Sequence, residues 1–157
     1  MTINYSSDND IIIPTQHNTT YRGLGGDDIY IITKVISDGA KINIVDTEGT
    51  NIIQLTEGLS ISSSKFASTA FQIILSNNAE ITISSSHKNL YEIGGNATTG
   101  LIVDQNSYEE FISHFGINSL PSIKSIKGLT NLIIEDEKLV TNDKIFLWEI
   151  KLSLIHI

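Results

Sequence analysis

Cysteine is absent from this chain of 157 residues, so neither a disulfide nor a thiolate metal site can form. Basic residues are few, with ten Lys and Arg against eighteen Asp and Glu, which leaves a net charge of −8. This charge argues against binding to nucleic acid or to anionic membrane surfaces, and it is compatible with binding cations. No apolar run approaches the roughly 18 residues of a membrane-spanning helix, and the first ten residues lack the pattern of a signal peptide.

Catalytic signatures are also lacking. His17, His87 and His114 have no metal-ligand spacing such as H-x-x-x-H, and no G-x-S-x-G motif occurs among the many serines. The acidic clusters at 109–110 and 135–137 are explained by a helix cap and a turn. We therefore expect that the chain is not an enzyme.

What is present is a glycine-rich turn with two acids, GLGGDDIY at residues 23–30, which leads into an apolar run. Divided into segments of nine, residues 5–31 read YSSDNDIII, PTQHNTTYR and GLGGDDIYI. Each segment has a large apolar or aromatic residue at its eighth position. The first and third segments have an acid at the sixth, so Asp10 and Asp28 lie eighteen residues apart.

This spacing has a physical meaning if each segment is a turn followed by a short strand. Two segments then complete one circuit, and the turns that carry Asp10 and Asp28 stack at roughly the 4.8 Å spacing of neighbouring strands. Because calcium–oxygen bonds are about 2.4 Å long, one ion could bridge the two carboxylates. Carbonyl oxygens of Asp8 and of the glycines could complete the ligand set. The alternative is a plain glycine turn with a solvated aspartate pair.

The stretch resembles the haemolysin-type calcium-binding repeat (RTX) family of secreted bacterial proteins. The resemblance is carried by Gly23, Gly26, Asp27, Asp28 and Tyr30, and by Asn9 to Ile12 in the first segment; it covers residues 5–31. Position two is Leu24 rather than glycine, and the middle segment has neither glycine nor acid, so at most one complete site is expected. The resemblance and the spacing together give these expected calcium ligands: Asp10, Asp28, Asp27, Asp8, Gly23 and Gly25.

The rest of the chain reads mainly as β-structure with one short helix. We expect a short β-roll that runs into a β-sandwich-like or meander domain, with strands at 41–45, 51–55 and 59–64 and a hairpin of 71–75 with 80–84. Residues 65–70 are expected to form a helical turn. Ser107, Glu110 and Gly116 mark a helix at 107–116 by a capping box and a terminal glycine. The expected organisation is one β-rich module over 1–151, made of the coil at 5–31, strands and hairpins at 32–106, the helix, and terminal strands at 123–150.

The last six residues, LSLIHI at 152–157, match a translated sequencing adaptor in one reading frame. We therefore interpret them as an artefact of a metagenomic fragment, and expect the natural chain to continue beyond Lys151 and Met1 to be internal to a longer protein.

These observations predict a non-catalytic calcium-binding module of a larger secreted or cell-surface bacterial protein, stabilised by calcium after export. Its expected partners are calcium and other domains of the same parent chain, without nucleic acid and without a membrane span. Two alternatives remain open: a carbohydrate-binding or adhesive β-domain, and a C-terminal appendage of a secreted protease or lyase.

Overall fold

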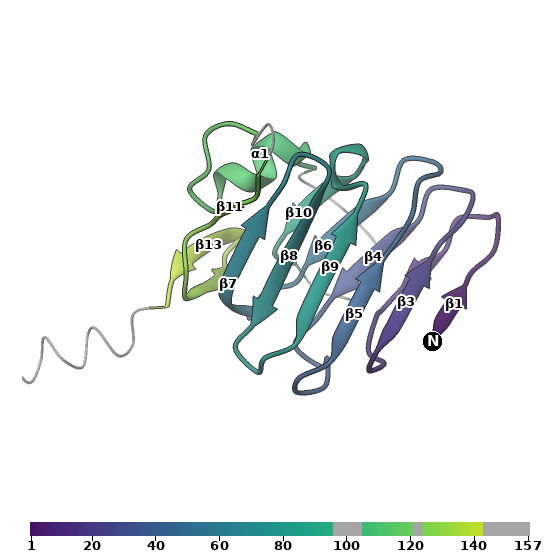
Figure 1. Cartoon of the computed structure of the whole chain (residues 1–157), viewed down its shortest axis with the longest axis horizontal. Helices are drawn as coiled ribbons and strands as arrows, with labels where there is room; N and C mark the ends of the chain where they lie inside the picture. The colour runs from purple at the N-terminus through teal and green to yellow at the C-terminus, as the bar shows by residue number, and fades with distance from the viewer. Residues whose placement is uncertain (96–104, 121–123, 143–157) are drawn as a thin grey trace, which may run out of the picture.

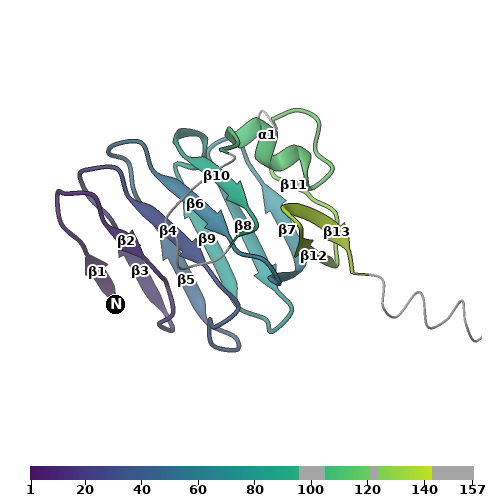
Figure 2. The same cartoon turned by 180° about the vertical axis from the view of Figure 1, so that it is seen from behind.

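The computed structural model describes residues 1–95, 105–120 and 124–142 and consists of two β-sheets in two layers with one short α-helix (Figures 1 and 2). The larger sheet has the strand order β1-β3-β5-β9-β8-β7-β12-β13, and β11 also pairs with β7. Its strands are β1 (Thr2–Asn4), β3 (Thr19–Arg22), β5 (Lys41–Ile44), β7 (Ser60–Phe66), β8 (Ala70–Leu75), β9 (Glu80–Ser84), β11 (Ile126–Lys127), β12 (Leu132–Glu135) and β13 (Lys138–Thr141). The smaller sheet has the order β10-β6-β4-β2, formed by β2 (Ile11–Ile12), β4 (Ile29–Ile32), β6 (Ile52–Leu55) and β10 (Leu90–Ile93).

The chain alternates between the sheets, and a strand of the larger sheet followed by a strand of the smaller one is called a circuit below. The four circuits are β1–β2, β3–β4, β5–β6 and β9–β10, and neighbouring circuits pair in parallel in both sheets. Ile11 lies opposite Ile29, an offset of eighteen residues, whereas Ile29 lies opposite Ile52, an offset of twenty-three. The spacing of the first two circuits is therefore the one that the acidic turns predict.

The two edges of this stack differ in how much their connections vary. Connections from the larger to the smaller sheet span residues 5–10, 23–28, 45–51 and 85–89, so their lengths stay between five and seven residues. Connections in the other direction span 13–18, 33–40 and 56–79. The last of these contains β7 and β8, which form an antiparallel hairpin inserted before β9. All the large variation in length therefore falls on one edge.

The inserted region confirms one prediction and corrects another. The hairpin of residues 71–75 with 80–84 is present as β8 and β9, with Ile73 opposite Ile81. The helical turn expected at 65–70 is wrong, because Lys65 and Phe66 continue β7 and pair with β8. In β7 the side chains of Ile61, Ser64 and Phe66 are buried, and a bulge between residues 61 and 63 restores the alternation that the serine run obscures in the sequence.

The helix α1 (Tyr108–Ser113) covers one end of the core (Figure 1). Its capping box is formed as predicted: Ser107 Oγ accepts from Glu110 N, and Ser107 N donates to Glu110 Oε1. The helix is shorter than the expected 107–116, and Gly116 follows with a φ of 84°. The helix packs through an aromatic cluster of buried rings whose centroids lie 4.2 to 6.5 Å apart: Phe66, Phe71, Tyr91, Tyr108, Phe111 and Phe115.

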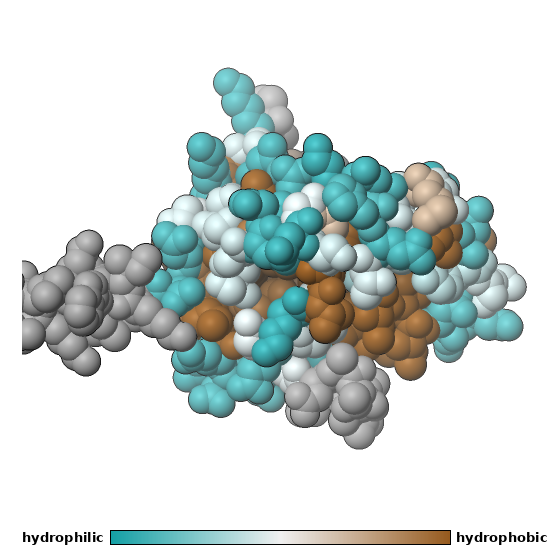
Figure 3. Space-filling view, turned by 90° about the horizontal axis from the view of Figure 1, so that it is seen from below, coloured by the Kyte–Doolittle hydropathy of each residue, from teal (hydrophilic) through white to brown (hydrophobic). Residues whose placement is uncertain are grey.

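The core lies between the two sheets, and β5 shows why the sequence folds this way. In KINI the isoleucines are buried and the polar residues exposed, which is the period-two pattern of a half-buried strand. On the outward side of the smaller sheet, a row of Ile11, Ile29, Ile52 and Leu90 crosses all four strands. Ile11 is 62% exposed, so hydrophobic side chains form part of the molecular surface (Figure 3).

Two of the terminal strands expected within 123–150 are present as β12 and β13, joined by a turn in which Asp136 and Glu137 have positive φ. The end of that expected range, at 143–150, and the artefact at 152–157 lie outside the described residues. Within the described residues, no helix has the length and apolar character needed to cross a membrane.

Candidate functional site

One column of side chains runs along the edge where the strands of the smaller sheet begin. Asp10, Asp28, Asn51 and Asn89 each directly precede such a strand, and we call them the Asx column. Strand pairing brings the members of neighbouring circuits together, because Ile29 N donates to Asp10 O and Ile52 N donates to Asp28 O, both at 2.9 Å. The two aspartates that the sequence predicts to stack are therefore neighbours in this column.

Two side chains of the Asx column, those of Asp28 and Asn51, bind the backbone of the preceding circuit, whereas the buried Asn89 Oδ1 has no hydrogen-bond partner among the described residues. Asp10 N donates to Asp28 Oδ1 at 2.8 Å, and Asp28 N donates to Asn51 Oδ1 at 2.9 Å. Short polar side chains with this reach replace ladder hydrogen bonds at turns. One oxygen of the Asp28 carboxylate therefore has a structural role in joining the first circuit to the second.

The other oxygen of that carboxylate has no such partner. Asp28 is completely buried, and its Oδ2 atom lacks a hydrogen-bond donor among the residues that the structure describes. It points toward Gly23, where a Cβ atom would lie within 2.5 Å of Asp28 Oδ2, Asp46 Oδ2 and Tyr30 Oη. That point is one bond length from Gly23 Cα, so it is not itself an ion position, but it shows that three oxygens converge on one small volume. We call Asp28, Asp46 and Tyr30 the buried acidic cluster.

Asp46 is the member that sequence reasoning missed. It follows β5 and is brought against Gly23 by the pairing of β3 with β5, in which Tyr21 lies opposite Ile44. Its Oδ2 atom accepts from Tyr30 Oη at 2.6 Å, and its Oδ1 atom accepts from Glu48 N at 3.2 Å. The sequence signal that could have identified Asp46 is its place directly after the alternating strand KINIV, two residues beyond the buried Ile44.

Tyr30 is fixed by its two hydrogen bonds. Its hydroxyl accepts from Gly23 N at 2.8 Å and donates to Asp46, so it has no remaining proton to offer Asp28. Burial and the charge of Asp46 raise the pKa of Tyr30, which keeps its hydroxyl protonated. Tyr30, the aromatic residue at the eighth position of the third segment, is fully buried.

The electrostatics of the cluster are unfavourable for two bare carboxylates. Burial is the largest cause that raises the pKa of Asp28 to about 7, and Asp46 adds to it, whereas the hydrogen bond from Asp10 N acts in the opposite direction. Two ionised carboxylates in contact away from water repel each other and lose hydration. The pair therefore needs either a shared proton, which lets Asp28 donate to Asp46, or a cation.

The remaining predicted ligands do not join this cluster. The Asp10 carboxylate accepts from Ser6 N and Ser6 Oγ at 3.0 to 3.1 Å, and Asp8 is exposed. Asp27 is also exposed, and its Oδ1 atom accepts from Thr50 N at 2.8 Å.

The glycines of the turn serve close stacking. A Cβ at Gly25 would lie 3.2 Å from Ser7 O, and a Cβ at Gly26 would lie 2.5 Å from Asp8 O. The expected set Asp10, Asp28, Asp27, Asp8, Gly23 and Gly25 is thus stacked on one edge without converging on one point. Among the described residues, no three His, Cys, Asp or Glu side chains gather as a metal-binding group.

In comparisons with known proteins, no protein-family model, no curated protein and no solved structure matches the chain.

Proposed function

We propose that the chain is a non-catalytic structural module of a larger secreted or cell-surface bacterial protein, in which calcium stabilises the fold after export. In this proposal the first circuits are a short β-roll of the RTX kind. The observation that carries it is the fully buried Asp28 carboxylate, whose free oxygen faces a second buried carboxylate at Gly23.

The side-chain oxygens of the cluster are of the ligand type that calcium binds. Asp28 and Asp46 supply carboxylate oxygens, the ligand type that calcium prefers, and the cradle at Gly23 is open only because no Cβ fills it. Calcium takes six to eight oxygens, so carbonyl oxygens of the stacked turns and water would complete its shell. When bound, the ion would neutralise the two carboxylates and hold the second circuit to the third.

In this proposal, calcium stabilises the fold outside the cell. Extracellular calcium modules often bind with dissociation constants of about 10⁻⁴–10⁻³ M. An ion present at about 100 times its dissociation constant adds about 2.7 kcal/mol to the free energy of unfolding. For a domain of this size that gain raises the melting temperature by roughly 5–11 °C.

Asp28→Asn tests the proposal. The asparagine Oδ1 atom can still accept from Asp10 N, and its amide can donate to Asp46, so the circuit stays joined while the charge is lost. We expect the wild type to melt higher with calcium than with a chelator, and the variant to show no such difference. Calorimetric titration should give about one calcium ion per wild-type chain.

Asp38→Asn is the matched control, because it removes the same charge from an exposed turn. Its calcium response should equal that of the wild type. An undiminished calcium response in Asp28→Asn would refute the assignment of the site, and no response in the wild type would refute the function.

A further inference from the structure

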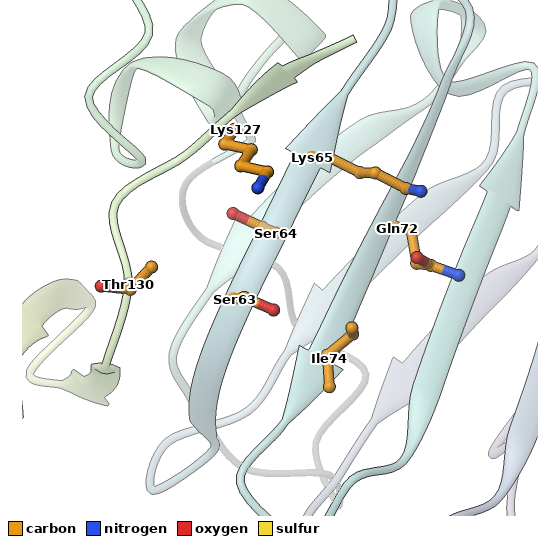
Figure 4. Close-up of a pocket in the computed structure, with 7 residues that line it drawn as sticks. All are labelled: Ser63, Ser64, Lys65, Gln72, Ile74, Lys127 and Thr130. Carbon is orange, nitrogen blue, oxygen red and sulfur yellow. The ribbon is translucent and has the colours of Figure 1, made fainter.

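A hollow of about 350 Å³ opens on the larger sheet where β7, β8 and β11 meet (Figure 4). Its volume lies within the range of small-ligand pockets. No Asp or Glu among the described residues lines it, although the chain as a whole is strongly acidic. The polar residues that line it are Ser63, Ser64, Lys65, Gln72, Lys127 and Thr130.

Two lysines on neighbouring strands line this hollow: in Figure 4 the side chain of Lys127 lies beside Ser64, and that of Lys65 extends over β8 toward Gln72. Lys65 on β7 lies directly opposite Lys127 on β11 in an antiparallel pair. Like charges at directly opposite positions destabilise a sheet. Both side chains are exposed, and within the described residues neither forms an ion pair or a hydrogen bond. The two positive charges are therefore not neutralised by any carboxylate of the described residues.

Gly128 explains how the pair comes together. Gly128 N donates to Ser64 O at 3.1 Å, and a Cβ at this glycine would lie 2.5 Å from Ser64 Oγ and 3.0 Å from Phe115 Cβ. Any larger residue would push β11 away from β7 and separate the lysines. The sequence thus holds Lys127 close to Lys65 despite the repulsion.

Neutral donors surround the lysines. The amide of Gln72, opposite Lys65 on β8, donates to Thr82 Oγ1 at 3.3 Å and keeps a second N–H. Ser63 adds a hydroxyl to the lining, whereas Thr130 turns its methyl group toward β7 and its hydroxyl away (Figure 4). Ser64, only 5% exposed, lies with Phe66 on the core side of β7, so its hydroxyl is on the opposite face from Lys65.

We propose that this hollow binds an oxyanion, a carboxylate or a sulfate group, between the ammonium groups of Lys65 and Lys127. The group could be a free inorganic ion or part of an acidic polysaccharide, since both present the same charged oxygens. The net charge of −8 repels polyanions at long range, so binding depends on this local pair and weakens as salt rises.

The test compares two double variants of the full chain that lose the same charge. Lys65→Gln with Lys127→Gln removes the lysine pair of the hollow, whereas Lys34→Gln with Lys88→Gln removes two exposed lysines elsewhere. The first arm titrates sodium sulfate against each protein by calorimetry, without added calcium. The second arm measures retardation in electrophoresis gels that contain polygalacturonate, with dextran gels as the neutral reference.

We expect the wild type and the Lys34/Lys88 variant to bind in the same arm or arms, and the Lys65/Lys127 variant to bind at least tenfold more weakly. Binding of sulfate alone assigns a free-ion site, and retardation by polygalacturonate assigns an acidic-polysaccharide site. Without any anion, the Lys65/Lys127 variant should melt up to about 3 °C higher than the wild type, because the repulsion is gone. Absence of binding in both arms, or equal loss in both double variants, would overturn the proposal.

Discussion

Gly23→Ala is the sharpest perturbation of the buried acidic cluster. Gly23 does not have a positive φ, so its backbone conformation is open to alanine. If space around it were free, the substitution would stabilise the fold by about 0.4–1 kcal/mol through the entropy of the unfolded chain. The structure predicts the opposite sign, because the new methyl group would meet Asp28 Oδ2, Asp46 Oδ2 and Tyr30 Oη within 2.5 Å.

The magnitude follows from two effects. Forcing extra volume into a packed interior costs about 1–3 kcal/mol. Displacing the Tyr30 hydroxyl breaks its bonds to Gly23 N and Asp46, and leaving a buried polar group unpaired costs about 1–3 kcal/mol more. We expect a loss of about 2–6 kcal/mol, a large share of the 5–15 kcal/mol by which most domains are stable.

Urea unfolding in calcium-free buffer measures this loss. With a slope of about 2 kcal/mol per molar urea, the midpoint should fall by about 1–3 M while the slope stays unchanged. Gly39→Ala is the control, because Gly39 has a φ of 69° and nothing lies within 4 Å of its added Cβ. It should cost only the backbone strain of about 1–2 kcal/mol. A Gly23→Ala protein as stable as the wild type, or more stable, would refute the geometry of the cluster.

Two further predictions concern the same cluster. In calcium-free buffer, the folded chain binds a proton at Asp28 up to its pKa of about 7, whereas the unfolded chain releases it near the ordinary value of 3.8. The free energy of unfolding should therefore decrease by at most about 4 kcal/mol as the pH rises from about 4 to about 7. Urea titrations of Asp28→Asn should not show this decrease. Tyr30→Phe should lower the free energy of unfolding by about 1–3 kcal/mol, because Gly23 N and Asp46 lose their partner. A phenylalanine variant that unfolds at the wild-type urea concentration would contradict this role.

Local sequence signals predicted the parts of the fold that depend on neighbouring residues. The hairpin of β8 with β9 and the capping box of Ser107 with Glu110 are both formed by side chains and turns within a few residues. The eighteen-residue distance between Asp10 and Asp28 could be predicted because the two connections between them, 13–18 and 23–28, are both six residues long.

The position of Asp46 could not be predicted from sequence spacing. It lies eighteen residues after Asp28, so a strict repeat would place it next in the Asx column. The third circuit is offset by twenty-three residues, and Asn51 occupies that place instead. Asp46 reaches Asp28 from the opposite end of its turn, because β3 and β5 pair in the other sheet. A contact of this kind depends on the lengths of two connections at once, which sequence spacing alone does not fix.

The unequal connections have a practical consequence for changing this protein. On the edge of the Asx column, each turn is bonded to the next, so an inserted residue would move Asp28 or Asn51 out of reach of its neighbour's amide. On the opposite edge the chain already accommodates a whole hairpin between β6 and β9. Foreign peptides or reporter sequences should therefore be grafted at residues 33–40, where they would leave the acidic turns undisturbed.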